Sequence, residues 1–187
     1  DNGNNKEDST ILLDWTHNGN IACYIRNRKN MHFYHARNQG LKMATGDYIC
    51  ISDNDILYKH GWLEKCIGIL QAHPDKKIAV TPLKTDRQHR NNKHWVGELE
   101  YEGKQYLVNL KAGSNCWVMR REDFFEVGEF VAHPIAGSKW ANRFVDLGYQ
   151  MATLEEAPRI PGREFLAEDM AFKKGYNFKA PIENYEL

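Results

Sequence analysis

The spacing of apolar residues along the chain predicts alternating helices and short strands. Apolar positions three and four apart indicate helices, whereas short runs of β-branched and aromatic residues indicate strands. The predicted helices cover 9–15, 32–45, 61–72, 122–127 and 138–147, and the predicted strands cover 21–26, 47–52, 78–81, 95–101, 105–110, 114–119 and 149–154. The runs 95–101 and 105–110 predict a small antiparallel hairpin around Glu102-Gly103. The whole order is typical of a single α/β domain with a doubly wound, mostly parallel sheet.

One helix and the strand after it define the centre of this predicted sheet. Phe33, Ala36 and Leu41 share a face of the helix over 32–45, and we expect that face to be buried. A glycine directly after the helix ends it. The run 47–52 is apolar and rich in strand-forming residues, so we expect it to be covered on both faces, as strands of a parallel sheet are.

Two carboxylates, Asp53 and Asp55, follow this strand directly. Side chains two positions apart point to the same side of an extended chain, so both can reach one ion. Carboxylate oxygens are hard ligands of the kind that Mg²⁺ and Mn²⁺ prefer. A solvated turn also accounts for the pattern, because Asp and Asn are favoured in turns.

The segments on either side carry further short motifs in a fixed order. They are Asp1-Asn2-Gly3, Ile25-Arg26-Asn27, Ala36-Arg37-Asn38-x-Gly40, Ala44-x-Gly46-Asp47-Tyr48-Ile49, the Asp53-x-Asp55 (DXD) pair, Gly61-Trp62-Leu63, Arg120-Arg121-Glu122 and Val127-Gly128-Glu129-Phe130. Together they resemble the nucleotide-sugar half of inverting glycosyltransferases of the GT-A fold, the large family 2 type. The resemblance spans nearly the whole chain.

This resemblance implies a metal-dependent glycosyltransferase that moves a sugar from a nucleoside-diphosphate sugar, a UDP-sugar first of all, to an acceptor hydroxyl with inversion. Asp1 would read the nucleotide base, and Arg37 would contact the nucleotide or its phosphates. Asp55 would hold Mn²⁺ or Mg²⁺, and Asp53 would reach the same ion directly or through water and ribose. The acceptor would be a carbohydrate or a glycoconjugate, and neither nucleic acid nor a membrane span is implied.

The resemblance also divides the chain. Residues 1–83 would form the donor-binding half, residues 84–160 the acceptor-side half, and residues 161–187 a partly irregular C-terminal tail. The family normally has a strand, a helix and a second strand before its Asp-Asn-Gly motif. We therefore expect a further segment of roughly forty to fifty residues to precede Asp1.

The expected catalytic base is missing from its place. The family carries a Glu-Asp pair at the start of a helix, and that place corresponds here to Ala136-Gly137. Candidates for a displaced base are Glu129, His133, Glu168 and Asp169. Retaining chemistry without such a base stays open, and so does a non-catalytic module that binds sugar nucleotides. A nucleotidyltransferase on a related sheet would require a glycine-rich loop upstream of Asp1.

Composition removes other classes of protein. Lys plus Arg and Asp plus Glu number 25 each, so no broad basic field indicates nucleic-acid binding. No apolar run approaches the roughly 18 residues that a membrane helix requires. The four cysteines, Cys23, Cys50, Cys66 and Cys116, lack metal-site spacing. They are interpreted as buried thiols of a reducing compartment, which favours a cytoplasmic location.

The acceptor-side half offers two further candidates for ligand contact. The polar run 84–94 is rich in basic residues and predicts an exposed loop that could also cover an anionic ligand. Trp95, Trp117 and Trp140 could stack on a sugar, although core packing is the favoured interpretation of each one singly, because Trp is highly buried on average.

Overall fold

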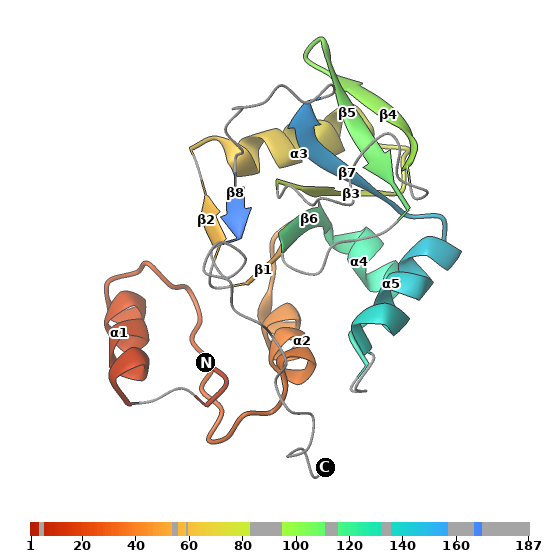
Figure 1. Cartoon of the computed structure of the whole chain (residues 1–187). Helices are drawn as coiled ribbons and strands as arrows, with labels where there is room; N and C mark the ends of the chain where they lie inside the picture. The colour runs from red at the N-terminus through yellow and green to blue at the C-terminus, as the bar shows by residue number, and fades with distance from the viewer. Residues whose placement is uncertain are drawn as a thin grey trace.

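A six-stranded mixed sheet with helices on both faces forms the centre of the computed structural model (Figure 1). The structure describes residues 1–3, 6–53, 56–58, 60–82, 95–110, 116–131, 136–156 and 167–169. Its helices are α1 (Lys6–His17), α2 (Phe33–Met43), α3 (Trp62–Ala72), α4 (Arg121–Val127) and α5 (Ala136–Asp146). Its strands are β1 (Tyr48–Ser52), β2 (Ile56–Tyr58), β3 (Ile78–Thr81), β4 (Trp95–Tyr101), β5 (Lys104–Asn109), β6 (Cys116–Arg120), β7 (Gln150–Glu156) and β8 (Ala167–Asp169).

The sheet has the order β1-β6-β3-β7-β5-β4, and its strand directions correct the expectation of a mostly parallel sheet. Within the described strands, only β3 and β7 pair in parallel, whereas β6 runs antiparallel to both β1 and β3. Parallel neighbours need a long crossover, usually a helix. In the described part of the chain, no helix lies between β3 and β6. The strands of this stretch are therefore not joined by helical crossovers and can pair in antiparallel.

The hairpin of β4 and β5 was predicted correctly and extends the sheet beyond β7. Glu102 and Gly103 form its turn, and both have positive φ angles, of 51° and 72°. Two such residues in succession are typical of the tight turns that match the twist of a hairpin. The antiparallel character of this end of the sheet therefore follows from a local sequence signal.

Two hydrophobic layers cover the sheet. One face packs against α2, α4 and α5 and the other against α3. In β1, Ile49 and Ile51 are buried in the first layer, whereas Cys50 and Ser52 on the other face are exposed. The prediction that 47–52 is covered on both faces is therefore wrong. Because β1 is an edge strand of the six-stranded sheet, it alternates as a half-buried strand does.

Aromatic side chains fill much of the first layer. Trp117 and Trp140 are 1% and 2% exposed, and their stacked rings lie 5.0 Å apart. These two tryptophans therefore belong to the core, and the alternative that they stack on a sugar is wrong. Trp95, on the edge strand β4, is exposed.

Several local predictions also need correction. Residues 21–26 form no strand, since they join neither sheet of the described structure: Ile21 N–H donates to the Trp15 carbonyl, and the Ile25 carbonyl accepts from the N-terminal amine of Asp1. The buried face of α2 consists of Tyr34, Asn38 and Leu41, so Phe33 is exposed. Cys23 and Cys50 are exposed rather than buried. In the tail, β8 pairs with β2, and neither strand was expected.

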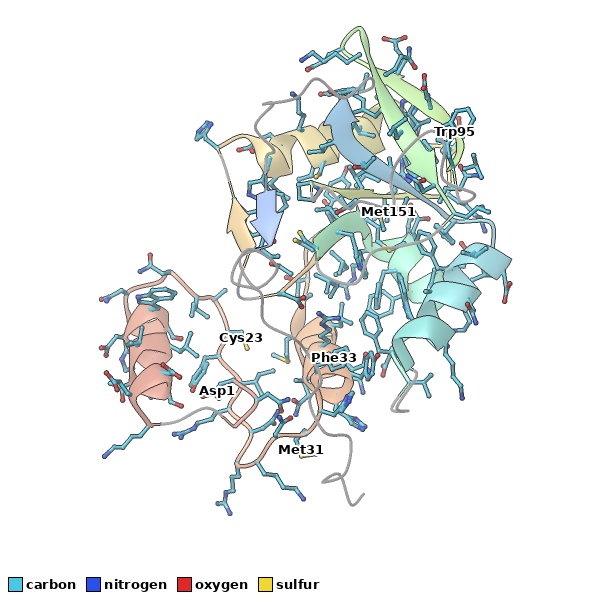
Figure 2. The ribbon with its side chains drawn as sticks, viewed as in Figure 1. Asp1, Cys23, Met31, Phe33, Trp95 and Met151 are labelled. Carbon is cyan, nitrogen blue, oxygen red and sulfur yellow. The ribbon has the colours of Figure 1, made fainter. Side chains whose placement is uncertain are left out.

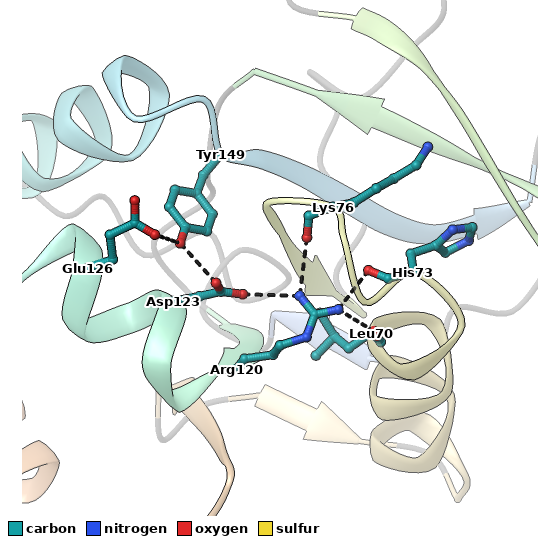
Figure 3. A network of polar contacts seen from close by, with 7 residues as sticks. All are labelled: Leu70, His73, Lys76, Arg120, Asp123, Glu126 and Tyr149. Atoms are coloured by element: carbon teal, nitrogen blue, oxygen red, sulfur yellow. Dashed lines mark hydrogen bonds and ion pairs between the residues drawn. The ribbon is translucent and has the colours of Figure 1, made fainter.

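Arg120, the last residue of β6, connects this strand to α4 and to the C-terminal end of α3 (Figure 3). Its guanidinium donates to the carbonyl oxygens of Leu70, His73 (2.7 Å) and Lys76 (3.1 Å) at the end of α3, and to Asp123 Oδ2 (3.1 Å). The Tyr149 hydroxyl donates to Asp123 Oδ1 (2.9 Å) and Glu126 Oε2 (2.6 Å). Burial, followed by these two bonds, raises the pKa of Tyr149, which therefore remains a donor at neutral pH.

Two helical glycines should respond oppositely to alanine. A Cβ on Gly68 of α3 would lie 2.1 Å from the Tyr101 hydroxyl oxygen, whereas a Cβ on Gly40 of α2 would meet nothing within 4 Å. Alanine gains about 1 kcal/mol of helix propensity over glycine, but overpacking costs about 1–3 kcal/mol. We expect Gly40→Ala to raise the midpoint of urea unfolding and Gly68→Ala to lower it. A stabilised Gly68→Ala would show that Tyr101 moves away at little cost.

Candidate functional site

The described part of the candidate site begins where β1 ends. Asp53 directly follows Ser52, the last residue of β1, and its side chain is 36% exposed. Arg37 projects from α2 and its Nη2 donates to Asp53 Oδ1. Arg37 is only 17% exposed, so this ion pair is partly shielded from solvent. The structure therefore brings together two residues that the sequence analysis assigned to nucleotide binding.

Aromatic rings flank the Arg37 guanidinium. Its central carbon lies 5.0 Å from the centre of the Phe33 ring and 5.9 Å from that of Phe130. Rings at this range attract a cation and restrict the orientations of a planar guanidinium. Arg37 is thus held in place by contacts from α2 and from the segment after α4.

Asp1 lies in a separate polar cluster beside α1. Its side chain is fully buried, and Oδ2 accepts hydrogen bonds from Ser9 Oγ (2.7 Å) and the Tyr24 hydroxyl (2.5 Å). Arg26 Nε lies 3.7 Å from the same oxygen. Side chains of this N-terminal region gather next to α1 and α2 (Figure 2). The carboxylate therefore ties α1 to the irregular chain before α2.

An amide network connects Asp1-Asn2-Gly3 to α2. Asn27 and Gln39 exchange hydrogen bonds of 2.9 and 3.1 Å through their side chains, and Asn27 also donates to Asn2 (3.2 Å). Gly3 has a φ of 90°, and a Cβ there would lie 2.8 Å from the backbone nitrogen of Asn30. The glycine of this motif therefore serves a close backbone approach that other residues would disrupt.

Behind Asp53, a hydroxyl and thiol cluster joins β1, β2 and β6. Ser52 Oγ donates to the Asp53 carbonyl at 2.7 Å and contacts the Tyr58 hydroxyl, which donates to Cys116 Sγ at 2.9 Å. Burial, and then the bond to Cys116, raises the pKa of Tyr58, so it stays protonated. These bonds fix the chain on both sides of the DXD segment.

The C-terminal strand β8 lies alongside the residues that follow the DXD pair. In the antiparallel β2–β8 pair, Asp169 is opposite Ile56 and Glu168 is opposite Leu57. Opposed Cα atoms in such pairs are about 4.5–5.5 Å apart. The backbone of the acidic pair in the tail is therefore paired with the strand that follows Asp53 and Asp55 in the chain.

Comparison with known protein families identifies the family of this chain. Residues 1–128 match the model of the family described as glycosyl transferase family 2, which is more than half of the chain. The chain belongs to glycosyl transferase family 2. The match includes α2, the Arg37–Asp53 pair and α4. A search of curated proteins finds no match to this sequence.

Solved structures confirm the GT-A fold for this family 2 glycosyltransferase chain. A crystal structure of GalNAc-T7 with UDP, GalNAc and Mn²⁺ matches with a TM-score of 0.62 at 15% sequence identity. The match covers 82% of this chain and 35% of that one, so the chain spans about a third of that protein's length. At this identity the match establishes the fold alone.

The Glu-Asp pair that the resemblance led us to expect as the source of a base is absent from the start of α5. This helix begins at Ala136 and has no acidic residue in its first turn. Of the alternative bases, Glu129 lies just after α4, and its Oε1 is 3.6 Å from Lys42 Nζ. Glu168 and Asp169 lie on β8, as described above. His133, like Asp55 and the loop 84–94, lies outside the described residues.

The described residues contain no group of three or more His, Cys, Asp or Glu side chains that could hold a metal ion. Asp53 nevertheless fits such an ion chemically, because its partly exposed side chain carries a carboxylate, a hard ligand of the type that Mn²⁺ and Mg²⁺ bind. Among the described helices, none is long and apolar enough to cross a membrane.

Sequence reasoning missed three contributors to this site. The Phe130 ring lies beside the Arg37 guanidinium, and Asn38 holds the backbone of Phe130. Tyr58 links the chain after the DXD pair to β6. Asn38 and Phe130 both lie inside the motifs that carry the resemblance, which was an available signal. A three-residue strand such as the one with Tyr58 gives no detectable periodicity.

Proposed function

We propose that this chain is the sugar-nucleotide-binding and catalytic part of a divalent-metal-dependent glycosyltransferase. It transfers a sugar from a nucleoside-diphosphate sugar, with a UDP-sugar as the favoured donor, to a carbohydrate hydroxyl with inversion. Family membership supports the reaction class. The observation that carries the proposal is the Arg37–Asp53 pair at the end of β1, where an α/β sheet typically binds its ligands.

The reaction breaks the bond between the anomeric carbon and the diphosphate as the acceptor oxygen attacks that carbon. Negative charge then accumulates on the departing diphosphate, and a positioned cation stabilises it. Arg37 is suited to this task because its planar fork can bind two phosphate oxygens at once. Asp53 and Asp55 would hold the divalent ion, which supplies further charge neutralisation as a Lewis acid when bound.

The acceptor hydroxyl must also lose a proton, which requires a general base within hydrogen-bond reach. We propose that the base comes from Glu168-Asp169, because β8 pairs with the strand that follows the DXD segment. Glu129 is the second candidate. Its carboxylate is already engaged by Lys42, whose Nζ lies 3.6 Å from Oε1.

Ligand binding and turnover test this proposal together. We expect UDP with Mn²⁺ to raise the melting temperature, since a ligand at a hundred times its Kd adds about 2.7 kcal/mol of stability. Chelation by EDTA should remove most of this gain. Incubation with Mn²⁺ and a panel of UDP-sugars should release UDP, measured by a coupled assay. No stabilisation by UDP, with or without metal, would contradict the proposal.

A non-catalytic module that binds sugar nucleotides is the second candidate function. The absence of an acidic residue from the first turn of α5 favours it. The two functions differ in a single result. Stabilisation by UDP and Mn²⁺ without any UDP release, tested over several UDP-sugars and acceptors, would support the binding module.

A further inference from the structure

A buried amide on α2 holds the segment that follows α4. Asn38 is 9% exposed, and its Nδ2 donates to the carbonyl oxygen of Phe130 at 2.7 Å. The backbone N–H of Phe130 donates in return to Asn38 Oδ1 at 3.0 Å. A carboxamide carries both a donor and an acceptor, so one side chain satisfies both polar groups of that peptide backbone. The contact fixes Phe130 at two points.

Phe130 in turn restricts Arg37. Its ring is 6% exposed and lies 5.9 Å from the Arg37 guanidinium and 5.2 Å from the buried Trp140 ring. With Trp140 and α2 on either side, the ring has little room to move. Arg37 is thereby confined between Phe33 of its own helix and a ring whose backbone Asn38 holds.

The residues before Phe130 are anchored from the acceptor side. Trp140 Nε1 donates to the Gly128 carbonyl at 2.8 Å, and Arg143 Nη2 donates to the Glu129 carbonyl. Asn38 instead reaches the segment from the donor-side helix that carries Arg37. It is therefore placed to connect acceptor-side packing with the Arg37–Asp53 pair.

We propose that Asn38 is a positioning residue for sugar-nucleotide binding. By fixing Phe130, it sets the Arg37 guanidinium at the Asp53 carboxylate, where the diphosphate of the donor would lie. This inference rests on the proposed function and deepens it. It assigns Asn38 a task that acts through Arg37 and involves no direct contact with the ligand.

A double-mutant cycle tests the inference, with the Kd for UDP in saturating Mn²⁺ measured by calorimetry on the full chain. We expect Asn38→Ala to weaken UDP binding about tenfold, as loss of a supporting residue typically does. Because Asn38 acts through Arg37, the double variant Asn38→Ala with Arg37→Ala should bind no more weakly than Arg37→Ala alone. Phe130→Leu keeps the backbone bonds but removes the ring, and should weaken binding as Asn38→Ala does.

The control is Tyr149→Phe, which removes two partly buried hydrogen bonds, to Asp123 and Glu126, from a network that does not include Arg37, and which should leave the Kd unchanged. If Asn38→Ala weakened UDP binding by the same factor in the wild-type protein and in Arg37→Ala, the positioning role would be overturned. Wild-type affinity for UDP in Asn38→Ala would overturn it as well. If Asn38→Ala does not fold, Phe130→Leu takes its place in the cycle. Wild-type protein that fails to bind UDP would overturn the proposed function and this inference with it, whereas the other outcomes affect the inference alone.

Discussion

Replacing Asp53 by Asn should lower turnover by roughly 10²–10³-fold, the loss expected when one preorganised charged group is removed from such a site. The substitution keeps the size and one carbonyl oxygen of the side chain but removes its charge. Binding of UDP with Mn²⁺ should weaken in parallel, because both the predicted metal ligand and the partner of Arg37 are lost. Isothermal titration with UDP and Mn²⁺, together with initial rates of UDP release, measures both effects.

Stability should change much less than activity in this variant. The Asp53 side chain is partly exposed, and ion pairs of this kind contribute about 1 kcal/mol or less. Asp75→Asn, in the exposed turn after α3, is the matched control and should leave activity at the wild-type level. Asp55→Ala should reproduce the loss of metal-dependent UDP binding. Unchanged affinity in Asp53→Asn would remove Asp53 from the site.

Replacing Arg120 by Ala should destabilise the fold by about 3–5 kcal/mol, which is a large part of the 5–15 kcal/mol that stabilises a typical domain. Arg120 is 13% exposed and neutralises Asp123, which is 15% exposed. Its removal would leave that carboxylate without its ion-pair partner and would strip three carbonyl groups near the end of α3 of a donor. Urea unfolding monitored by tryptophan fluorescence measures the free energy of unfolding.

Two further variants separate the contributions to this network. Arg120→Lys keeps the charge but loses the planar fork that reaches several acceptors, so we expect an intermediate loss. Lys77→Ala removes a pair with Glu126 in which both side chains are more than 40% exposed, and should cost about 1 kcal/mol at most. If Arg120→Ala were as mild as Lys77→Ala, the network in Figure 3 would not be a major source of stability.

Sequence patterns predicted the helices and most strands because each has a local cause. The end of α2 was placed within two residues, and the hairpin turn is marked by Glu102-Gly103. Strand direction has no such local cause. It depends on which strands become neighbours, and β6 inserts between β1 and β3 although it follows both in the chain. The expectation of parallel pairing was therefore wrong, because strand direction depends on the long-range order of the strands in the sheet.

The candidate site likewise has contacts that the sequence predicted and contacts that it did not. Arg37 and Asp53 were predicted from the resemblance, and the structure brings them into contact. Asn38 is polar, and a periodicity argument assigns polar residues to the surface, so its burial depended on a partner that only the tertiary structure supplies. The pairing of β8 with β2 joins two short segments that are far apart in the chain and have weak local preference. Such contacts give no signal in a single sequence.

The bond between Asn38 and Phe130 has a consequence for how the protein is made. Its two residues are 92 positions apart, so a chain growing from its N-terminus completes α2 long before Phe130 leaves the ribosome. Contacts of such long range form slowly because the intervening chain must first be ordered. Until Phe130 emerges, Asn38 and the side of Arg37 that its ring covers would stay open to water and to chaperones. The surroundings of the Arg37–Asp53 pair should therefore mature late, at a time set by translation of the segment after α4.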